Sequence, residues 1–337
     1  MRAFVITSAR QAEVREVGVP VAGPGEVVVA VERVGLCGTD VEFFTGEMAY
    51  LASGEATYPI RIGHEWAGVV VEVGEGIDAA WTGRRVTGDT MLGCGQCSRC
   101  RSGRQYLCAD RREVGIRRGW PGALAERLRV PASSLRGLPD TMDATLGALV
   151  EPGGNAWRAV EAAKLEAGQR LLVIGAGTIG LLSALIAAAA GIEIHILGRS
   201  EASLAFARSL GFDRTWSAAA PPTELFDAVI DASTDAGSPS RALDLVEPGR
   251  RIVFIGLSGQ PSTIDTRRLV LEDVTAVGIL SASPGLDGAI DLLATGRIEP
   301  RPLVAAVVGL EDVGRVLAGE RDPSWGAGPK VEVDPRR

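Results

Sequence analysis

The chain has 337 residues, 46% of them hydrophobic and 23% charged, which is enough for two globular domains of roughly 150 residues each. Its formal net charge of −7 argues against a nucleic-acid partner, because phosphate binding requires a dense excess of Lys and Arg on one face. The opening sequence MRAFVITSAR has no apolar core of signal-peptide length, so we expect a cytoplasmic protein.

Residues 1–150 consist of short β-rich runs that are separated by Gly and Pro. The runs AFVIT, EVVVAVERVG and WAGVVVEVG are of strand length and rich in valine. This pattern predicts a compact, mostly antiparallel, barrel-like domain.

Potential metal ligands are spread over three segments of this first part. Cys37 lies in GLCGTD, His64 and Glu65 lie in GHEWAG, and Glu151 opens EPGGNAWRAV. A single buried histidine is more often a structural residue than a ligand. A cysteine, a histidine and carboxylates from separate segments, however, predict an open zinc site with one position left for water or substrate.

The other four cysteines are clustered in CGQCSRCRSGRQYLC. Four thiolates at this spacing can surround zinc tetrahedrally, so we predict a structural zinc site in a small lobe. An iron–sulfur cluster is the main alternative, but its usual fourth cysteine follows after three residues and precedes proline. Unliganded thiols are the other alternative, although exposed thiols oxidise readily. The predicted ligands are Cys94, Cys97, Cys100 and Cys108.

From Gly168 onward, strand-like and helix-like segments alternate. This order predicts a parallel sheet with helices on both faces, followed after about residue 280 by a return to the first domain. The apolar stretch Leu171–Leu197 is long enough for a membrane span, but its glycines and its changes of period predict strand, helix and strand instead. We therefore expect no membrane partner.

The motif GAGTIG directly follows the first strand of this region and opens a helix. Glycines at such a turn allow a pyrophosphate to approach the helix N-terminus, so the motif predicts dinucleotide binding by Gly175, Gly177, Thr178, Ile179 and Gly180.

The second strand of the region ends in LGRSE, without the acidic residue that binds the adenosine ribose in NAD enzymes. Gly198 adds no negative charge there, and Arg199 and Ser200 can bind a 2′-phosphate, which favours NADP over NAD. In the alternative interpretation Arg199 is simply solvated, near Glu201.

Together these features resemble the zinc-dependent medium-chain alcohol dehydrogenases, in the branch of the polyol, sorbitol, threonine and glucose dehydrogenases. The resemblance implies a GroES-like catalytic domain (1–150, with the zinc lobe at 94–108), a Rossmann domain (151–280) and a return to the catalytic domain (281–337). It also implies a homo-oligomer, a dimer or a tetramer formed through the edge of the Rossmann sheet.

The same resemblance assigns roles to the residues of the open zinc site. Cys37, His64 and Glu151 become ligands, and Glu65 becomes either a ligand or an alternating one. Thr39 would pass on the alcohol proton, and Asp40 would orient the ligand histidine. The implied reaction transfers hydride between a secondary alcohol, polyol or sugar and NADP(H), with zinc polarising the substrate oxygen.

The segments CGTDVEFFTGE and REVGIRRGWPG are similar to those of the glucose dehydrogenases. By this likeness Glu42 and Glu113 bind sugar hydroxyls, and surface solvation is the alternative for both. The cluster of Arg117, Arg118 and Trp120 is either a site for an anionic substrate or a solvated face.

Two rival functions remain open at this stage. One is a zinc-free quinone or enoyl reductase, which would not need Cys37 or His64. The other is a non-catalytic, NADP-binding regulatory protein that uses zinc only for folding. The second histidine, His195, is interpreted as structural.

Overall fold

The computed structural model describes residues 1–337, and the chain divides into two compact units. Unit 1 consists of Met1–Glu151, Val304–Gly326 and Lys330–Arg337. Unit 2 consists of Pro152–Leu303 and Ala327–Pro329. None of the helices combines the length and the apolar character needed to cross a membrane.

Unit 1 is built around a 7-stranded sheet in the order β16-β17-β3-β4-β5-β9, with β8 paired to β3. Strands β16 and β17 are parallel, and the other pairs are antiparallel. The strands are β3 (Glu26–Gly35), β4 (Glu65–Val73), β5 (Arg85–Gly88), β8 (Arg127–Pro131), β9 (Leu135–Gly137), β16 (Val304–Val308) and β17 (Lys330–Val333).

The core of unit 1 follows from the valine-rich pattern of its strands. In β3, Val27, Val29 and Val31 are fully buried and belong to the same apolar cluster as Trp66 of β4. β-branched side chains such as valine pack well on a pleated surface, which explains why this segment forms a strand.

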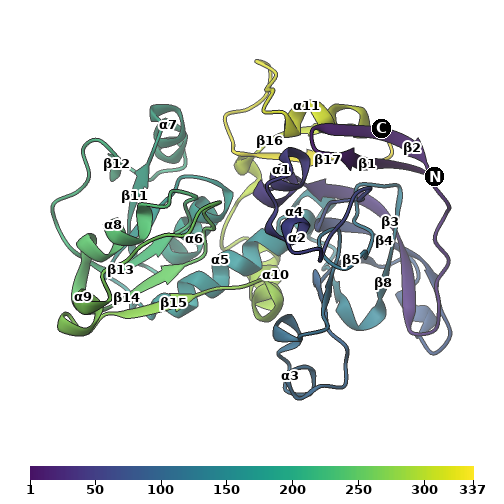
Figure 1. The fold of residues 1–337 in the computed structure, drawn as a ribbon, viewed down its shortest axis with the longest axis horizontal. Helices are drawn as coiled ribbons and strands as arrows, with labels where there is room; N and C mark the ends of the chain where they lie inside the picture. Colours follow the sequence, from purple (N-terminus) through teal and green to yellow (C-terminus); the bar gives the residue numbers. More distant parts are fainter. The chain divides into compact units, whose positions relative to one another are not determined.

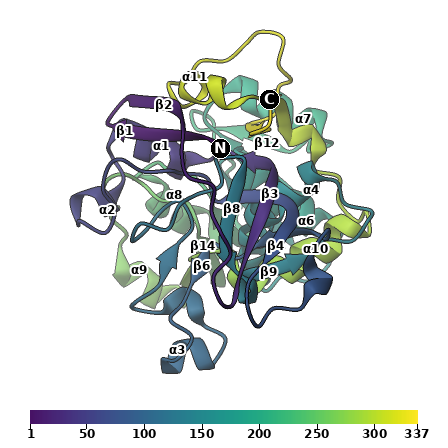
Figure 2. The ribbon, with the colours of Figure 1, turned by 90° about the vertical axis from the view of Figure 1, so that its right-hand side faces the viewer.

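Unit 1 also contains two small hairpin-like sheets and several short helices. In both views the segment that carries α3 projects away from the strands of the unit (Figure 1 and Figure 2). The elements are β1 (Arg2–Ser8), β2 (Gln11–Glu16), β6 (Met91–Leu92), β7 (Arg112–Glu113), α1 (Gly38–Thr45), α2 (Ala49–Ala52), α3 (Ser98–Arg101), α4 (Ala144–Ala148), α11 (Val313–Leu317) and the 3₁₀ helices η1 (Ala79–Trp81), η2 (Gln105–Leu107), η3 (Ala132–Ser134) and η6 (Leu310–Asp312).

Unit 2 contains a 6-stranded sheet in the order β12-β11-β10-β13-β14-β15, in which every pair is parallel. Helices α6, α7 and α8 pack against its strands (Figure 1). The elements are β10 (Arg170–Ile174), α6 (Thr178–Ala189), β11 (Glu193–Gly198), α7 (Glu201–Ser209), β12 (Thr215–Ser217), β13 (Phe226–Asp231), α8 (Ser238–Leu245), β14 (Val246–Phe254), α9 (Thr266–Leu271), β15 (Thr275–Gly278), η4 (Ser283–Gly285), α10 (Leu286–Ala294) and η5 (Arg301–Leu303). Helix α5 (Val150–Ala163) begins in unit 1 and continues into unit 2.

The central strands of unit 2 are continuous apolar runs because neighbouring strands and helices cover them. Four of the five residues of β10 are buried. The predicted fold class is confirmed, with a mainly antiparallel β-rich unit and a parallel sheet wound with helices.

Candidate active site

Cys37 and His64 meet at the ends of two neighbouring strands of unit 1. Cys37 follows β3 and caps the N-terminus of α1, and His64 immediately precedes β4. The Cys37 Sγ and His64 Nε2 atoms are 3.1 Å apart, and His64 is only 5% exposed. Register pairing of β3 with β4 therefore brings together two residues that are far apart in sequence.

Asp40 faces His64 Nδ1, the ring nitrogen opposite the one that faces the Cys37 sulfur. Its Oδ2 accepts a hydrogen bond of 2.9 Å from the Cys37 backbone N–H, and its Oδ1 lies 3.8 Å from His64 Nδ1. That Oδ1 and that Nδ1 are both buried without a hydrogen-bond partner. A carboxylate that faces the outer nitrogen of a metal-binding histidine fixes the tautomer and orientation of the ring.

Glu65 is also at this site, but its carboxylate is held by a residue that the sequence analysis missed. Lys330 of β17 donates to Glu65 Oε2 at 2.6 Å, to Glu65 Oε1 at 2.9 Å and to the Leu36 carbonyl at 2.8 Å. Both side chains are almost completely buried. Gly35 makes room for the carboxylate, because a Cβ there would lie 2.1 Å from Glu65 Oε2.

The donor set at this site fits a divalent cation with mixed sulfur, nitrogen and oxygen preference. The ligand atoms of Cys37, His64 and Glu65 all lie within 4.8 Å of one another. Burial raises the pKa of the Cys37 thiol, and a bound cation would reverse that shift by favouring the thiolate. Zinc accepts all three ligand types.

The other two predicted residues of this site flank the cluster. Glu151 is 8% exposed and is one of the acidic groups that raise the pKa of His64 against the opposing effect of burial. Thr39 is half-buried in the first turn of α1, and its hydroxyl forms no hydrogen bond with the protein. Its hydroxyl is therefore available to a substrate.

The four-cysteine lobe has the geometry of a tetrahedral sulfur site. All four Sγ atoms lie within 4.8 Å of one another, with 4.0 Å between Cys94 and Cys100 and 3.8 Å between Cys97 and Cys108. A tetrahedral zinc with Zn–S bonds of about 2.3 Å requires S–S distances of about 3.8 Å. The lobe therefore fits a structural zinc ion, which a closed four-thiolate set binds well.

The start of α3 helps to ionise one of these thiols. The Cys100 backbone N–H donates to Cys97 Sγ at 3.5 Å and lowers the pKa of that thiol to about 6. Thiolates are the form that binds metal, so this thiol is ready for a metal near neutral pH.

The two candidate sugar-binding acids differ in their surroundings. Glu113 is only 3% exposed, and its Oε1 accepts from Arg111 Nε at 2.7 Å and from the Tyr50 hydroxyl at 3.4 Å. Surface solvation is therefore wrong for Glu113. Glu42 is half-buried on α1, without a hydrogen bond to its carboxylate, and partial burial raises its pKa.

In unit 2, the GAGTIG turn joins β10 to α6 with the three glycines in different roles. Gly175 has a φ of +107°, and a Cβ at Gly180 would lie 1.9 Å from the Gly175 carbonyl oxygen, so this close packing requires glycine. Gly177 caps α6, and a Cβ there would meet nothing within 4 Å. Space is thus left open at the N-terminus of a 12-residue helix, which fits a pyrophosphate.

Arg199 is exposed at the end of β11 and forms no ion pair. The nearby Glu201 pairs with Arg208 instead, so it does not neutralise Arg199. The Ser200 hydroxyl caps α7 by accepting from the Ser203 backbone N–H at 3.2 Å.

The second histidine, His195, is held by neighbouring side chains of unit 2. His195 Nδ1 accepts from the Trp216 indole at 3.2 Å, and its Nε2 lies 2.9 Å from Glu193. These bonds hold a buried ring inside unit 2, as expected for a structural residue.

Two family models match separate parts of the chain. Residues 23–140 match the alcohol dehydrogenase GroES-like domain, and residues 178–295 match the zinc-binding dehydrogenase domain. An L-threonine 3-dehydrogenase of Streptomyces avermitilis is 32% identical over 330 residues, which cover 94% of this chain and 93% of that protein.

Two of the similar solved structures each match 99% of this chain and 99% of their own chain. An alcohol dehydrogenase of Escherichia coli CFT073 in complex with NADH has a TM-score of 0.90 at 25% identity. A zinc-binding dehydrogenase of Sinorhizobium meliloti 1021 bound to NADP has a TM-score of 0.88 at 29% identity. The predicted enzyme class and its zinc and NAD(P) cofactors are confirmed, and the chain belongs to the zinc-dependent medium-chain alcohol dehydrogenase family.

Proposed function

We propose that the chain is an NADP-linked dehydrogenase of a polyhydroxylated secondary alcohol, with Cys37, His64 and Glu151 as ligands of the catalytic zinc. The observation that carries the proposal is the buried pair of Cys37 Sγ and His64 Nε2 at 3.1 Å, with Asp40 facing His64 Nδ1. When bound, zinc polarises an alcohol oxygen and the nicotinamide accepts hydride.

The chain's own residues position the substrate and move its proton. Thr39 holds a hydroxyl without a protein partner in the first turn of α1, so it can relay the alcohol proton by accepting it while releasing its own hydroxyl proton to water. Asp40 would orient the His64 ring, because its Oδ1 faces His64 Nδ1 at 3.8 Å. Lys330 holds the Glu65 carboxylate beside the same cluster through a hydrogen bond, so that carboxylate is not free to bind the metal.

The preference for a polyol follows from the two acids. Carboxylates accept hydrogen bonds from hydroxyl groups, and Glu42 has no such bond within the protein. Glu113 is held in a fixed orientation by Arg111 and Tyr50, which suits an acceptor that must meet a hydroxyl at a set position. L-Threonine, the substrate in the name of the Streptomyces relative, is the secondary alcohol whose turnover should be compared with that of polyols.

The preference for NADP follows from Arg199. An exposed, unpaired guanidinium at the end of β11 can bind the 2′-phosphate, and Gly198 adds no competing carboxylate. Arg199→Gln should lower kcat/KM for NADP while leaving that for NAD nearly unchanged. An unchanged ratio of the two values would contradict the proposal.

The first experiment is a zinc determination together with a spectrophotometric screen of sugars, polyols, L-threonine and simple secondary alcohols with both coenzymes. We expect two zinc ions per chain and NADP-linked turnover of a polyol. Cys37→Ser should retain one zinc and lose turnover, and Thr39→Val should retain both and lose turnover. One zinc in the wild-type chain, or full activity of Cys37→Ser, would refute the proposed site.

We further propose a homo-oligomer in the cytoplasm. Strand β15 forms one edge of the parallel sheet, and Val270 and Leu271 in the preceding helix are 80% and 83% exposed. All five cysteines are free, as a reducing compartment would keep them. Light scattering on Val270→Lys checks the oligomer, which should become smaller than the wild type.

A further inference from the structure

Unit 1 contains a cavity of about 440 Å³ that none of the proposed zinc ligands lines. Its walls come from the β1–β2 hairpin and from residues 54–61 and 116–121. In a protein whose formal charge is −7, the lining contains three arginines and one glutamate, although two of the arginines also pair with a carboxylate outside the lining. These residues are Arg15, Arg61, Arg118 and Glu55.

Arg61 is the unusual residue of this cavity. Its Nε is buried without a hydrogen-bond partner, and its guanidinium forms no ion pair. Burial lowers the pKa of Arg61 to about 10, and no neighbouring carboxylate opposes that shift. The side chain as a whole is half-buried, and a guanidinium with a buried, unbonded N–H is costly, so an anion bound here would stabilise it.

Arg118 approaches the same cavity from a constrained turn. Its φ is +55°, which is uncommon for a residue other than glycine, and its backbone N–H donates to the Glu55 carbonyl at 2.8 Å. Its guanidinium lies 3.7 Å from Glu55 and 3.6 Å from Asp110, too far for hydrogen bonds. Glu55 is instead bound closely by Arg117, so Arg118 keeps free donors.

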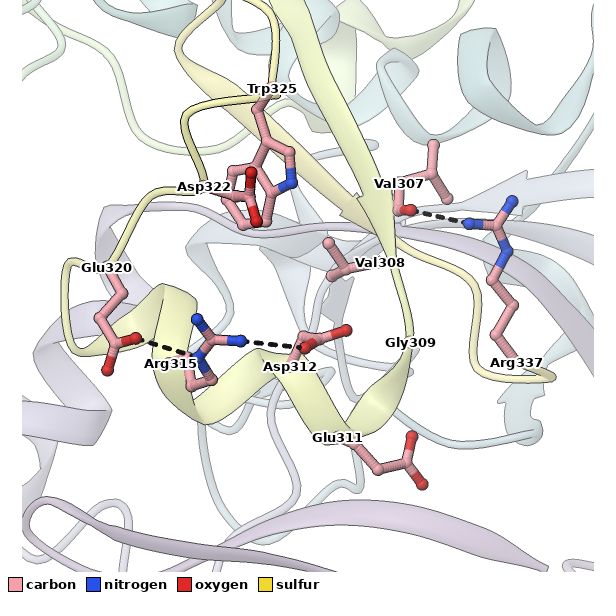
Figure 3. A pocket seen from close by; sticks show the side chains of 10 residues that line it. All are labelled: Val307, Val308, Gly309, Glu311, Asp312, Arg315, Glu320, Asp322, Trp325 and Arg337. Carbon is pink, nitrogen blue, oxygen red and sulfur yellow. Dashed lines mark hydrogen bonds and ion pairs between the residues drawn. The ribbon is translucent and has the colours of Figure 1, made fainter.

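In a second cavity of similar size, about 470 Å³, the arginines are bonded differently from Arg61 (Figure 3). There Arg315 donates to Glu320 at 2.9 Å and lies 3.7 Å from Asp312, and Arg337 donates to the Val307 carbonyl at 2.8 Å. The guanidinium groups of that cavity are thus already bonded within the protein, whereas that of Arg61 is not.

We propose that the cavity beside Arg61 binds a small molecule with a phosphate group. Arg61 and Arg118 would bind the phosphate through guanidinium donors that form no hydrogen bond within the protein. The apolar part of the ligand would lie against Val17, Ile60 and Trp120. The site contains neither the proposed zinc ligands nor the coenzyme turn. The proposal of a phosphate site can therefore be correct or wrong whatever the outcome for the proposed reaction.

Calorimetric titration of the full chain with phenyl phosphate, inorganic phosphate and phenol tests this proposal. We expect phenyl phosphate to bind more tightly than inorganic phosphate, and phenol not to bind. Arg61→Gln should weaken phenyl phosphate at least about 10-fold, as expected for loss of a charge-assisted hydrogen bond. Arg315→Gln, which removes a guanidinium from the second cavity, is the matched control and should leave this affinity unchanged.

Thermal unfolding shows whether Arg61→Gln loses binding because it lacks the guanidinium or because it fails to fold. Without anion, Arg61→Gln should melt at or near the wild-type temperature, because it removes a charge that forms no ion pair and a buried N–H that has no acceptor. Phenyl phosphate should raise the melting temperature of the wild type but not of Arg61→Gln. Equal binding by both proteins, or loss of binding in Arg315→Gln alone, would overturn the proposal. So would binding of phenol as tight as that of phenyl phosphate.

Discussion

The buried ion pair of Lys330 and Glu65 provides the sharpest test of how the cluster of Cys37, His64 and Glu65 is held together. Lys330 is 2% exposed, and its ammonium group donates to both carboxylate oxygens of Glu65 and to a backbone carbonyl. Removing one partner of such a pair leaves an uncompensated buried charge, which costs about 3–5 kcal/mol. Lys330→Met should therefore lower the free energy of unfolding by that amount.

Urea denaturation with excess zinc and with a chelator measures the effect. Glu65→Gln and the double variant complete a thermodynamic cycle, in which the double variant should cost much less than the sum of the two single changes. Zinc should stabilise Lys330→Met more than it stabilises the wild type, because the metal becomes the only cation near Glu65. Lys164→Met, at the exposed position of the other lysine, is the control.

Two results would refute this reasoning. The first is a loss below about 1 kcal/mol in Lys330→Met, which is the range of exposed ion pairs. The second is additivity of the two single changes, which would mean that Lys330 and Glu65 act independently.

Three further predictions concern the rest of the molecule. Full burial raises the pKa of Glu332 to about 8. Between pH 4.5 and that value, the folded state keeps a proton that the unfolded state has released. The free energy of unfolding that this residue contributes therefore falls by up to about 1.4 kcal/mol per pH unit as pH rises through this window. Glu332→Gln should therefore gain in unfolding free energy over the wild type as pH rises through that window, and a constant difference would contradict the assignment. Gly180→Ala should destabilise unit 2, because its Cβ would meet the Gly175 carbonyl at 1.9 Å, whereas Gly177→Ala should fold normally but bind NADPH more weakly by fluorescence titration; the opposite ranking would exclude the assigned roles. Cys100→Ser should reduce the zinc content by one ion per chain and lower the melting temperature, and an unchanged zinc content would show that the lobe holds no metal.

The features that could be predicted from the sequence are those whose chemistry is local. The four clustered cysteines and the GAGTIG turn each carry their geometry in a short segment, so their spacing alone indicates a metal site and a dinucleotide turn. The alternation of strands and helices likewise predicted the parallel sheet. Cys37 and His64 are 27 residues apart, and only the pairing of β3 with β4 shows that their side chains meet.

Lys330 could not be predicted from local pattern because its partner is 265 residues away. One signal was nevertheless present in the composition. Of the 35 basic residues, only Lys164 and Lys330 are lysines, so composition narrows the unusual cations to two positions, of which Lys164 is exposed. Arg61 had no such signal, since nothing in its neighbourhood distinguishes it from the other arginines. Its lack of a partner is visible only in the folded chain.

The requirement at position 330 is geometric, and it explains why arginine does not occur there. The ammonium nitrogen of Lys330 serves three acceptors at 2.6–2.9 Å from a single point. The fork of a guanidinium can bind both oxygens of a carboxylate, but the group is larger than an ammonium and spreads its donors over a plane, so it does not fit a closed space in which three acceptors surround one point. Lys330→Arg retains the positive charge but should still destabilise the cluster. The charge alone therefore does not explain this residue, and the compact form of its donor group does.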